Sequence, residues 1–369
     1  MKIFVTGTRG IPGIPGGVEK HCQQLYPHVV AKGHEVILCT RSCYVPEKLA
    51  SWEGIELVHV FAPRVKSLEA IVHTFKSLLA ARHHRPDVVH IHAIGPSLLV
   101  PFARLMGFKV VVTNHGPDYN RQKWGKLAKF VLRTGERMGN RFANEVIAIS
   151  NGIAENLRRL DGRESNIIYN GVEVQKISHS YNFLTRYNVK PGRYILAVAR
   201  LVPEKGIHDL IAAFNALGND HGYHLVIAGG ADHESPYSIN LKRMASQNSR
   251  IVMTGYIVGE DLRQAFSHAS LFVLPSYHEG LPIALLEALS FDLPVLVSDI
   301  TAHREIEIPQ ERYFKCGDVD DLRQRIQTLL RKERALGEKK AQLRLLQEKY
   351  DWRKIADQTI AIYRKAVER

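Results

Sequence analysis

Cysteines and long apolar runs are scarce in this sequence. Among 369 residues there are four cysteines, and their positions show no paired or metal-ligand spacing. No run of about 18 apolar residues occurs, so no segment is expected to span a bilayer. Residues 1–7 lack the layout of a signal peptide and enter a strand directly. Together these absences predict a protein of the reducing cytoplasm.

The composition that remains is that of a globular protein. Hydrophobic residues make up 45% of the chain and charged residues 24%, which excludes disordered, collagen-like and disulfide-built proteins. A chain of this length is too long to fold around a single compact core, so two or three domains are expected.

The basic charge is unevenly distributed. The formal net charge is +13, and residues 1–185 carry 24 Lys+Arg against 14 Asp+Glu, whereas residues 186–369 carry 26 against 23. The basic first half predicts an anionic partner, whether a nucleic acid, a membrane surface or a phosphorylated substrate.

Short runs rich in Val and Ile alternate with segments of helical length along both halves of the chain. Strands are expected at 2–6, 35–40, 88–92, 109–113 and 145–149, and again at 194–199, 224–228, 250–254, 271–275 and 294–298. This alternation is typical of α/β folds with doubly wound parallel sheets. A polar stretch without periodicity, 173–192, marks the boundary between two such domains, and the residues after 320 are expected to be helical throughout.

The first loop of interest, 7–19, is rich in glycine. It follows a strand and precedes a helix, whose free N–H groups suit an anion. Its glycine spacing is not that of a dinucleotide fold, and the second strand ends at Arg41 instead of an acidic residue. We therefore favour a phosphate-bearing ligand, with a structural turn as the simple alternative and NADP as a distant one.

Two further loops follow strands of the second half. Arg200 ends one strand and Lys205 lies in the next loop, where two cations suit a diphosphate. Glu279 lies between a strand and a helix that is expected to begin near Pro282. Glu287 stands inside this otherwise apolar helix, where its carboxylate needs a partner such as a ribose diol. Taken singly, these residues are also explained by solvated cations and structural ion pairs.

The order of these motifs resembles that of retaining GT-B glycosyltransferases of family 4, in the group 1 type that assembles bacterial polysaccharides. Glu279 and Glu287 resemble the paired glutamates of that family. The other matching segments are Gly16–Glu19, Thr113–Asp118, Tyr169–Val172, Arg200 with Lys205, Ile227–Gly230 and Val252–Gly255. The resemblance implies the GT-B fold, in which two Rossmann-like domains face each other across a cleft. It places an acceptor-side domain at 1–178, a helix at 352–369 that returns to it, and a donor domain at 179–351.

The resemblance also implies roles for individual residues. Glu287 would bind the ribose, Glu279 the hydroxyls of the donor sugar, and Arg200 and Lys205 the diphosphate, whose charge they would stabilise as the nucleotide departs. His115 would lie near the anomeric carbon and contact the sugar or the acceptor. Further donor contacts are implied for Gly16, Gly17, Tyr256, Gly280 and Leu281. Glu19 and Asp118 are candidates for the acceptor side, with capping of a helix or loop as the alternative.

The reaction that the resemblance implies is transfer of a hexosyl group from a nucleoside-diphosphate sugar with retention of configuration. The acceptor would be a glycan or a polyprenyl-diphosphate-linked glycan in envelope polysaccharide or lipopolysaccharide synthesis. No Asp-x-Asp motif stands at an expected strand end, so no metal or cofactor is expected and the cations take its place. Mannosyl, rhamnosyl, glucosyl and N-acetylhexosaminyl transfer all fit. The alternatives are a sugar-nucleotide epimerase of the same architecture and, with less support from the motifs, a nucleic-acid-binding protein.

A helix expected at 124–142 concentrates basic charge in the first half. Its apolar face is expected to contain Trp124, Leu127, Val131, Met138 and Phe142, and its basic face Lys126, Lys129, Arg133, Arg137 and Arg141, with Phe130 among the basic residues. A basic amphipathic helix suits an anionic leaflet. We therefore expect Lys126, Lys129, Phe130, Arg133 and Arg137 to touch the inner face of the plasma membrane. The ordinary alternative is an apolar face packed on the domain beneath a solvated basic face.

Overall fold

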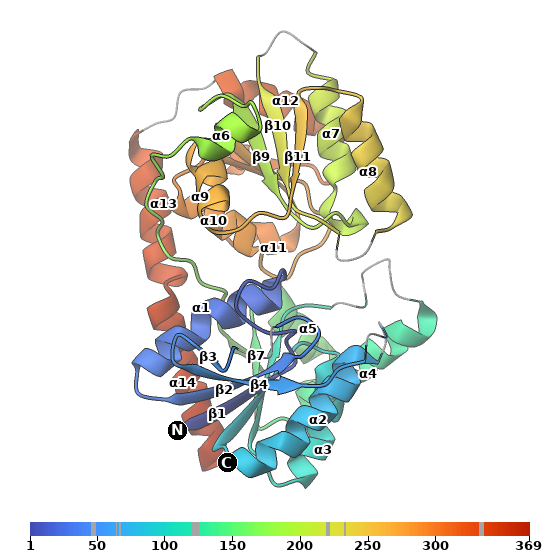
Figure 1. Ribbon diagram of the computed structural model, residues 1–369, viewed down its shortest axis with the longest axis vertical. Helices are drawn as coiled ribbons and strands as arrows, with labels where there is room; N and C mark the ends of the chain where they lie inside the picture. Colours follow the sequence, from blue (N-terminus) through green and yellow to red (C-terminus); the bar gives the residue numbers. More distant parts are fainter. Residues whose placement is uncertain are drawn as a thin grey trace. The chain divides into compact units, whose positions relative to one another are not determined.

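The chain folds into two compact units, each built around a parallel sheet. The computed structural model describes residues 1–45, 49–63, 65, 68–117, 119, 125–218, 222–231, 234–331 and 336–369, without the side chains of 336–340. The first unit is Met1–Gly171 with Tyr350–Arg369, and the second is Val172–Lys349 (Figure 1). The division therefore falls before residue 178, where the first domain was expected to end.

The sheet of the first unit has the order β3-β4-β2-β1-β5-β6-β7-β8. Its strands are β1 (Lys2–Thr6), β2 (Glu35–Arg41), β3 (Ser51–Trp52), β4 (Ile55–Val60), β5 (Val88–His92), β6 (Val110–Asn114), β7 (Glu145–Ala148) and β8 (Asn166–Ile167). All described neighbours are parallel except β3 and β4. The chain runs outward from β1 to β2 and β4 and then returns to β5 on the other side of β1. The switch point, where ligands of such sheets bind, therefore lies between the carboxyl ends of β1 and β5.

Helices cover this sheet and complete its core. They are α1 (Gly17–Ala31), α2 (Glu69–His84), η1 (Pro96–Leu99), α3 (Val100–Leu105), α4 (Lys126–Phe142), α5 (Asn151–Asp161) and α14 (Trp352–Glu368). The last of these comes from the end of the chain, and its Trp352, Ile355 and Tyr363 are buried in the same core as Ile3 and Tyr26. Asp351 caps α14 by accepting a 2.8 Å hydrogen bond from the Arg353 N–H.

The sheet of the second unit is entirely parallel, with the order β11-β10-β9-β12-β13-β14. Its strands are β9 (Tyr194–Val198), β10 (His224–Ala228), β11 (Ile251–Gly255), β12 (Leu271–Leu274), β13 (Val295–Ser298) and β14 (Tyr313–Phe314). The chain runs from β9 to β10 and β11 and then returns to β12 on the other side of β9. This places the second switch point between β9 and β12.

The helices of the second unit come before, between and after these strands along the chain. They are α6 (Asn182–Arg186), η3 (Pro203–Lys205), α7 (Ile207–Asn215), α8 (Pro236–Ser246), α9 (Gly259–Ser267), α10 (Ile283–Ser290), α11 (Thr301–Arg304), η4 (Gln310–Arg312), α12 (Val319–Arg331) and α13 (Leu336–Lys349). Buried aliphatic side chains of α7 and α12, including Leu210, Ile211 and Leu322, join those of β9 and β10 in one core.

The prediction of two doubly wound α/β domains is confirmed. The structure adds β3, β4, β8 and β14 to the predicted strands; β4 was missed because its pattern is amphipathic, and the other three have only two residues each. The region after residue 320 is not one continuous helical stretch, because Tyr350 and Asp351 separate α13 from α14. Within the described residues, no helix is long and apolar enough to cross a membrane.

Helix α4 packs by a face other than the one its apolar residues predict. Its buried positions are Gly135, Glu136, Gly139 and Asn140. A Cβ on Gly135 would lie 2.2 Å from the Ile94 carbonyl oxygen, so this face approaches the backbone before η1 closely. Leu127, expected on the packed apolar face, is instead 78% exposed, and Trp124 lies outside the described residues. The expected apolar face is therefore wrong, because close backbone contact at the glycines decides which side is buried.

Candidate functional site

The switch point of the second unit carries the cation and glutamate motifs. Arg200 and Lys205 follow β9, and Glu279 follows β12, its parallel neighbour in the sheet. Since the carboxyl ends of parallel neighbours meet at one edge, these loops lie side by side. Glu287 stands in α10, which begins at Ile283, one residue after Pro282.

Lys205 and Glu279 form an ion pair at this edge. The Lys205 Nζ lies 2.6 Å from Glu279 Oε1, and the two side chains are 17% and 9% exposed. The Ser276 hydroxyl donates a 2.7 Å hydrogen bond to the same oxygen. Burial alone would raise the pKa of Glu279, but the Lys205 charge and these hydrogen bonds outweigh it and hold the pKa below its ordinary value. Glu279 is therefore a carboxylate at neutral pH.

A second titratable group, which the sequence analysis did not single out, stands behind this pair. His303 of α11 is fully buried, and burial lowers its pKa to about 4. Its Nδ1 lies 2.8 Å from the Ser298 carbonyl oxygen, which only accepts, so Nδ1 carries the proton. The charged form of His303 would also lower the pKa of Glu279, so the two groups are close enough to interact electrostatically. A lone histidine inside a helix of one turn offers no sequence signal.

Gly206 allows the two loops to approach each other. Its φ is +63°, and a Cβ added there would lie 2.0 Å from the Pro275 carbonyl oxygen. On either side of this contact the Tyr277 N–H donates to the Glu204 carbonyl oxygen at 2.9 Å, and the Tyr277 hydroxyl donates to Asp209. The loop that holds Lys205 is thus attached to the loop that holds Ser276 and Glu279.

The remaining residues expected to contact the donor are distributed around this edge. Arg200 stands two residues after the end of β9 and is half-buried, as is Glu287 in α10. Gly280 and Leu281 lie in the loop before α10, and Tyr256, which is 52% exposed, follows β11. These residues therefore follow the same strands, β9, β11 and β12, whose carboxyl ends form this edge of the sheet, or stand in the helix after them.

The switch point of the first unit is occupied by the glycine loop. Gly16 is the N-cap residue of α1 and Gly17 its first residue. Glu19 is only 6% exposed, and it binds the Arg9 side chain and accepts a 3.1 Å hydrogen bond from the Arg9 N–H. Burial would raise the pKa of Glu19, but Arg9 outweighs it and lowers the pKa. These contacts give Glu19 a structural role that was not among those expected, which is to hold the glycine loop through Arg9.

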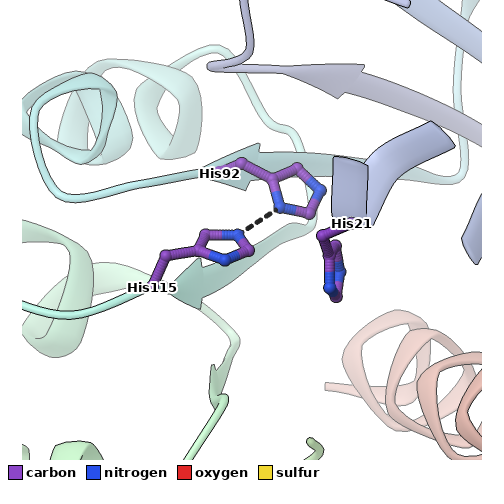
Figure 2. A group of neighbouring side chains, drawn as sticks. All are labelled: His21, His92 and His115. Atoms are coloured by element: carbon purple, nitrogen blue, oxygen red, sulfur yellow. Dashed lines mark hydrogen bonds between the residues drawn. The ribbon is translucent and has the colours of Figure 1, made fainter. Parts of the chain in front are cut away.

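His115 follows β6 in a turn that Asn114 organises. The Asn114 carboxamide accepts a 2.8 Å hydrogen bond from the Gly116 N–H and donates a 2.9 Å bond to Glu136 of α4. Two histidines that the sequence analysis did not single out, His21 of α1 and His92 at the end of β5, point toward His115 (Figure 2). His92 Nδ1 lies 3.0 Å from His115 Nε2. Asp118 lies outside the described residues.

Proteins of known class share this architecture. HepE from Anabaena in complex with UDP-glucose matches with a TM-score of 0.81 and 19% identity, over 98% of this chain and 99% of that one. An uncharacterized glycosyltransferase from Methanocaldococcus jannaschii is 25% identical over 100% of this chain and 99% of its own length. The glycogen synthase of Mycobacterium tuberculosis is 26% identical over 98% of this chain and 94% of its own. The fold is thus that of GT-B glycosyltransferases.

Two family models together match nearly all of the chain. The model described as Glycosyltransferase Family 4 matches residues 15–176, and the model described as Glycosyl transferases group 1 matches residues 186–348. The protein belongs to the family 4, group 1 glycosyltransferases, as its motif order implied.

Proposed function

We propose that this glycosyltransferase transfers a hexosyl group from a nucleoside-diphosphate sugar, with retention of configuration, to a glycan or polyprenyl-diphosphate-linked acceptor during envelope polysaccharide synthesis. The observation that carries the proposal is the Lys205–Glu279 pair at the switch point between β9 and β12. It puts a cation suited to phosphate and a carboxylate suited to sugar hydroxyls side by side. A relative that binds UDP-glucose and another that is a glycogen synthase support the same donor class and product class.

The donor contacts follow from the atoms that the pair uses. The Lys205 ammonium has three N–H donors, and Glu279 takes one, so we assign the others to the diphosphate together with Arg200. Both hydrogen bonds described for Glu279 end on Oε1, and we assign Oε2 to a sugar hydroxyl. Glu287 binds the ribose diol, Gly280 and Leu281 lie against the phosphates, and Tyr256 lines the base.

The chemical step needs no protein nucleophile in this proposal. The bond from the anomeric carbon to the phosphate oxygen breaks, and a new bond to the acceptor oxygen forms on the same face of the sugar. The acceptor proton goes to the departing phosphate, whose negative charge Arg200 and Lys205 stabilise. Because these two cations take the place that a divalent ion would occupy at the diphosphate, transfer requires no metal there. His115 of the first unit contacts the sugar or the acceptor, and Gly16 and Gly17 supply N–H groups to the donor.

Donor binding is tested by a thermal-shift screen over nucleoside diphosphates and their sugars. We expect one base to raise the melting temperature of the wild type and to have no effect on Glu287→Ala. Glu348→Ala is the matched control, because Glu348 is an exposed glutamate paired with Arg344 on α13. A shift that survives in Glu287→Ala would contradict the assigned site. Release of nucleoside diphosphate only in the presence of acceptor would distinguish transfer from epimerisation.

We also propose that the exposed face of α4 contacts an anionic membrane. Phe130 and Leu127 are 67% and 78% exposed, and Lys126, Arg133, Arg137 and Arg141 are exposed on the same helix. Lys129 is half-buried beside them, and the Arg133 guanidinium lies over the Tyr119 ring. Large apolar side chains among arginines suit an anionic interface, where the rings enter and the cations meet the headgroups.

Sedimentation with vesicles that contain phosphatidylglycerol tests the membrane contact. We expect the wild type to sediment and the triple variant Lys126→Glu, Lys129→Glu, Arg133→Glu to remain in the supernatant. The control carries the same change of net charge at exposed positions of the second unit, Lys190→Glu, Lys242→Glu and Arg243→Glu. Equal sedimentation of both variants would show that net charge alone, and not this face, governs any binding.

A further inference from the structure

Three histidines from separate elements bring ring nitrogens together in the first unit. His21 comes from α1, His92 from the end of β5 and His115 from the turn after β6, and one nitrogen of each lies within 4.8 Å of the others (Figure 2). The rings of His21 and His115 meet edge-on with centroids 5.0 Å apart. We propose that this His21–His92–His115 triad binds a divalent transition-metal ion, with Zn²⁺ as the ion it suits best.

Hydrogen bonds hold the outer nitrogens of His21 and His92, whereas His92 Nδ1 and His115 Nε2 share a 3.0 Å hydrogen bond that the ion would replace. His21 Nδ1 lies 2.9 Å from Asn170 Oδ1, which only accepts, so Nδ1 carries the ring proton and Nε2 presents a lone pair. On the far side of His92, Nε2 lies 2.7 Å from the Tyr26 hydroxyl. Metal-ligating histidines commonly have their second nitrogen held in this way, which fixes the tautomer and the direction of the ring.

The rings are also in the charge state that a metal requires. Burial lowers the pKa of His21 to about 4, although its bond to Asn170 raises it. Burial, with smaller contributions from neighbouring histidines, also lowers the pKa of His92 and of His115. Neutral imidazoles bind zinc directly, without first losing a proton. When the ion replaces the hydrogen bond between His92 Nδ1 and His115 Nε2, the ring that donated it moves its proton to its other nitrogen, and His92 then donates from Nε2 to the Tyr26 hydroxyl.

The spacing suits a tetrahedral ion. Nitrogens that each lie about 2.0–2.1 Å from zinc are separated from one another by about 3.3 Å in a tetrahedral site. The His92–His115 pair, at 3.0 Å, is near that value, and because no two of the nitrogens are more than 4.8 Å apart, the third ring needs to move by at most about 1.5 Å. His90 is not a fourth ligand, because its Nδ1 and Nε2 meet Tyr363 and Thr113 at 2.7 Å each. Three histidines therefore leave one position for water or another oxygen ligand.

His115 gives the ion a route of entry and gives its binding a consequence. His21 and His92 are buried, whereas His115 is only partly so. If His115 contacts the sugar or acceptor, as the proposed function holds, an ion on its Nε2 competes with that contact, and Zn²⁺ inhibits transfer reversibly. This consequence rests on the proposed function, but the metal site itself does not.

The site is tested by titrating Zn²⁺ into the chelator-treated full-length protein by calorimetry. We expect the wild type to bind one ion per chain and His21→Asn to bind it more than about 100-fold more weakly. Asn170→Ala should bind it about 10–100-fold more weakly, because Asn170 holds the second nitrogen of His21. The control is the pair His83→Ala and His84→Ala, which removes two neighbouring histidines of α2 and leaves the tight site intact. Circular dichroism and melting curves show that each variant is folded.

Cobalt supplies a readout that does not depend on activity. Co²⁺ in the wild type should give the intense visible bands of four-coordinate cobalt, and these should be lost in His21→Asn. Three results would each overturn the proposal. They are the lack of stoichiometric binding, the loss of binding in the His83→Ala, His84→Ala control, and the weak spectrum of a six-coordinate ion. If Zn²⁺ binds to the triad and yet leaves transfer unaffected, the assignment of His115 to the substrate fails while the metal site stands.

Discussion

Replacing Gly206 by alanine tests how the two loops of the donor site are held together. At φ +63° an alanine is strained, and its Cβ would lie 2.0 Å from the Pro275 carbonyl oxygen. That oxygen is part of the backbone, which cannot move aside as the end of a flexible side chain could. We therefore expect the loop with Ser276 and Glu279 to move away from Lys205.

The magnitude comes from comparison with a glycine of the same conformation. Gly192 has φ +66°, with nothing within 4 Å of an added Cβ. Gly192→Ala therefore carries only the left-handed strain, about 1 kcal/mol after the gain from a stiffer unfolded chain. Gly206→Ala adds the cost of overpacking, about 1–3 kcal/mol, for a total of about 2–4 kcal/mol. For a unit of this size, these losses lower the melting temperature by about 3 °C and about 6–12 °C respectively.

Differential scanning calorimetry measures both variants, and donor binding is measured on the folded proteins. We expect Gly192→Ala to bind the nucleotide found in the screen as the wild type does, and Gly206→Ala to bind it at least about tenfold more weakly, since a shift of the Glu279 loop separates the pair. Equal melting temperatures for the two variants would refute the argument, because the clash with Pro275 would then cost nothing. Lower stability with unchanged donor affinity would refute the link between this contact and the site.

Two further predictions concern buried charge and helix packing. Because the pKa of Glu279 lies below its ordinary value of 4.5, the charged carboxylate stabilises the fold above that pH, and its contribution is lost as the pH falls through the lowered pKa. In urea titrations, the unfolding free energies of wild type and Glu279→Gln should differ by about 1–3 kcal/mol. This difference should stay constant from pH 8 to about 5.5 and become smaller below about pH 4.5. A difference that grows on acidification would contradict the prediction. In α4, Gly135→Ala should destabilise by about 1–3 kcal/mol although alanine is the better helix former, because its Cβ meets the Ile94 carbonyl at 2.2 Å. Gly125→Ala, with open space at its Cβ, should change the stability far less, and equal effects in calorimetry would show that packing at Gly135 is not tight.

The parallel strands could be recognised in the sequence because their signal is local. Fully buried strands such as β12 consist of apolar residues alone, and the chain marks their ends with glycine, proline or a change of pattern. The alternation of these runs with helical segments restricts the fold to doubly wound sheets. Strand order then determines the switch points, which is why Lys205 and Glu279 could be predicted to share one edge before any contact was known.

Other features depend on residues that are distant in the chain. The sequence shows Glu19 only as a charged residue near the start of a helix. In the structure it is buried, because Arg9 of the preceding loop contacts it. The buried side of α4 could not be inferred from its apolar residues, since the approach of Ile94 to Gly135 decides it.

The amino-acid sequence by itself determined the class of fold, the family and the loops at which ligands are expected, because each of these is expressed in short segments and in their order. Only the tertiary structure decided that His21 and His92 join His115. The sequence separates these residues by dozens of positions, and α1, β5 and β6 bring their rings together only after the sheet has formed. Such convergence depends on strand order and helix placement across the whole unit, and no local pattern of residues carries that information.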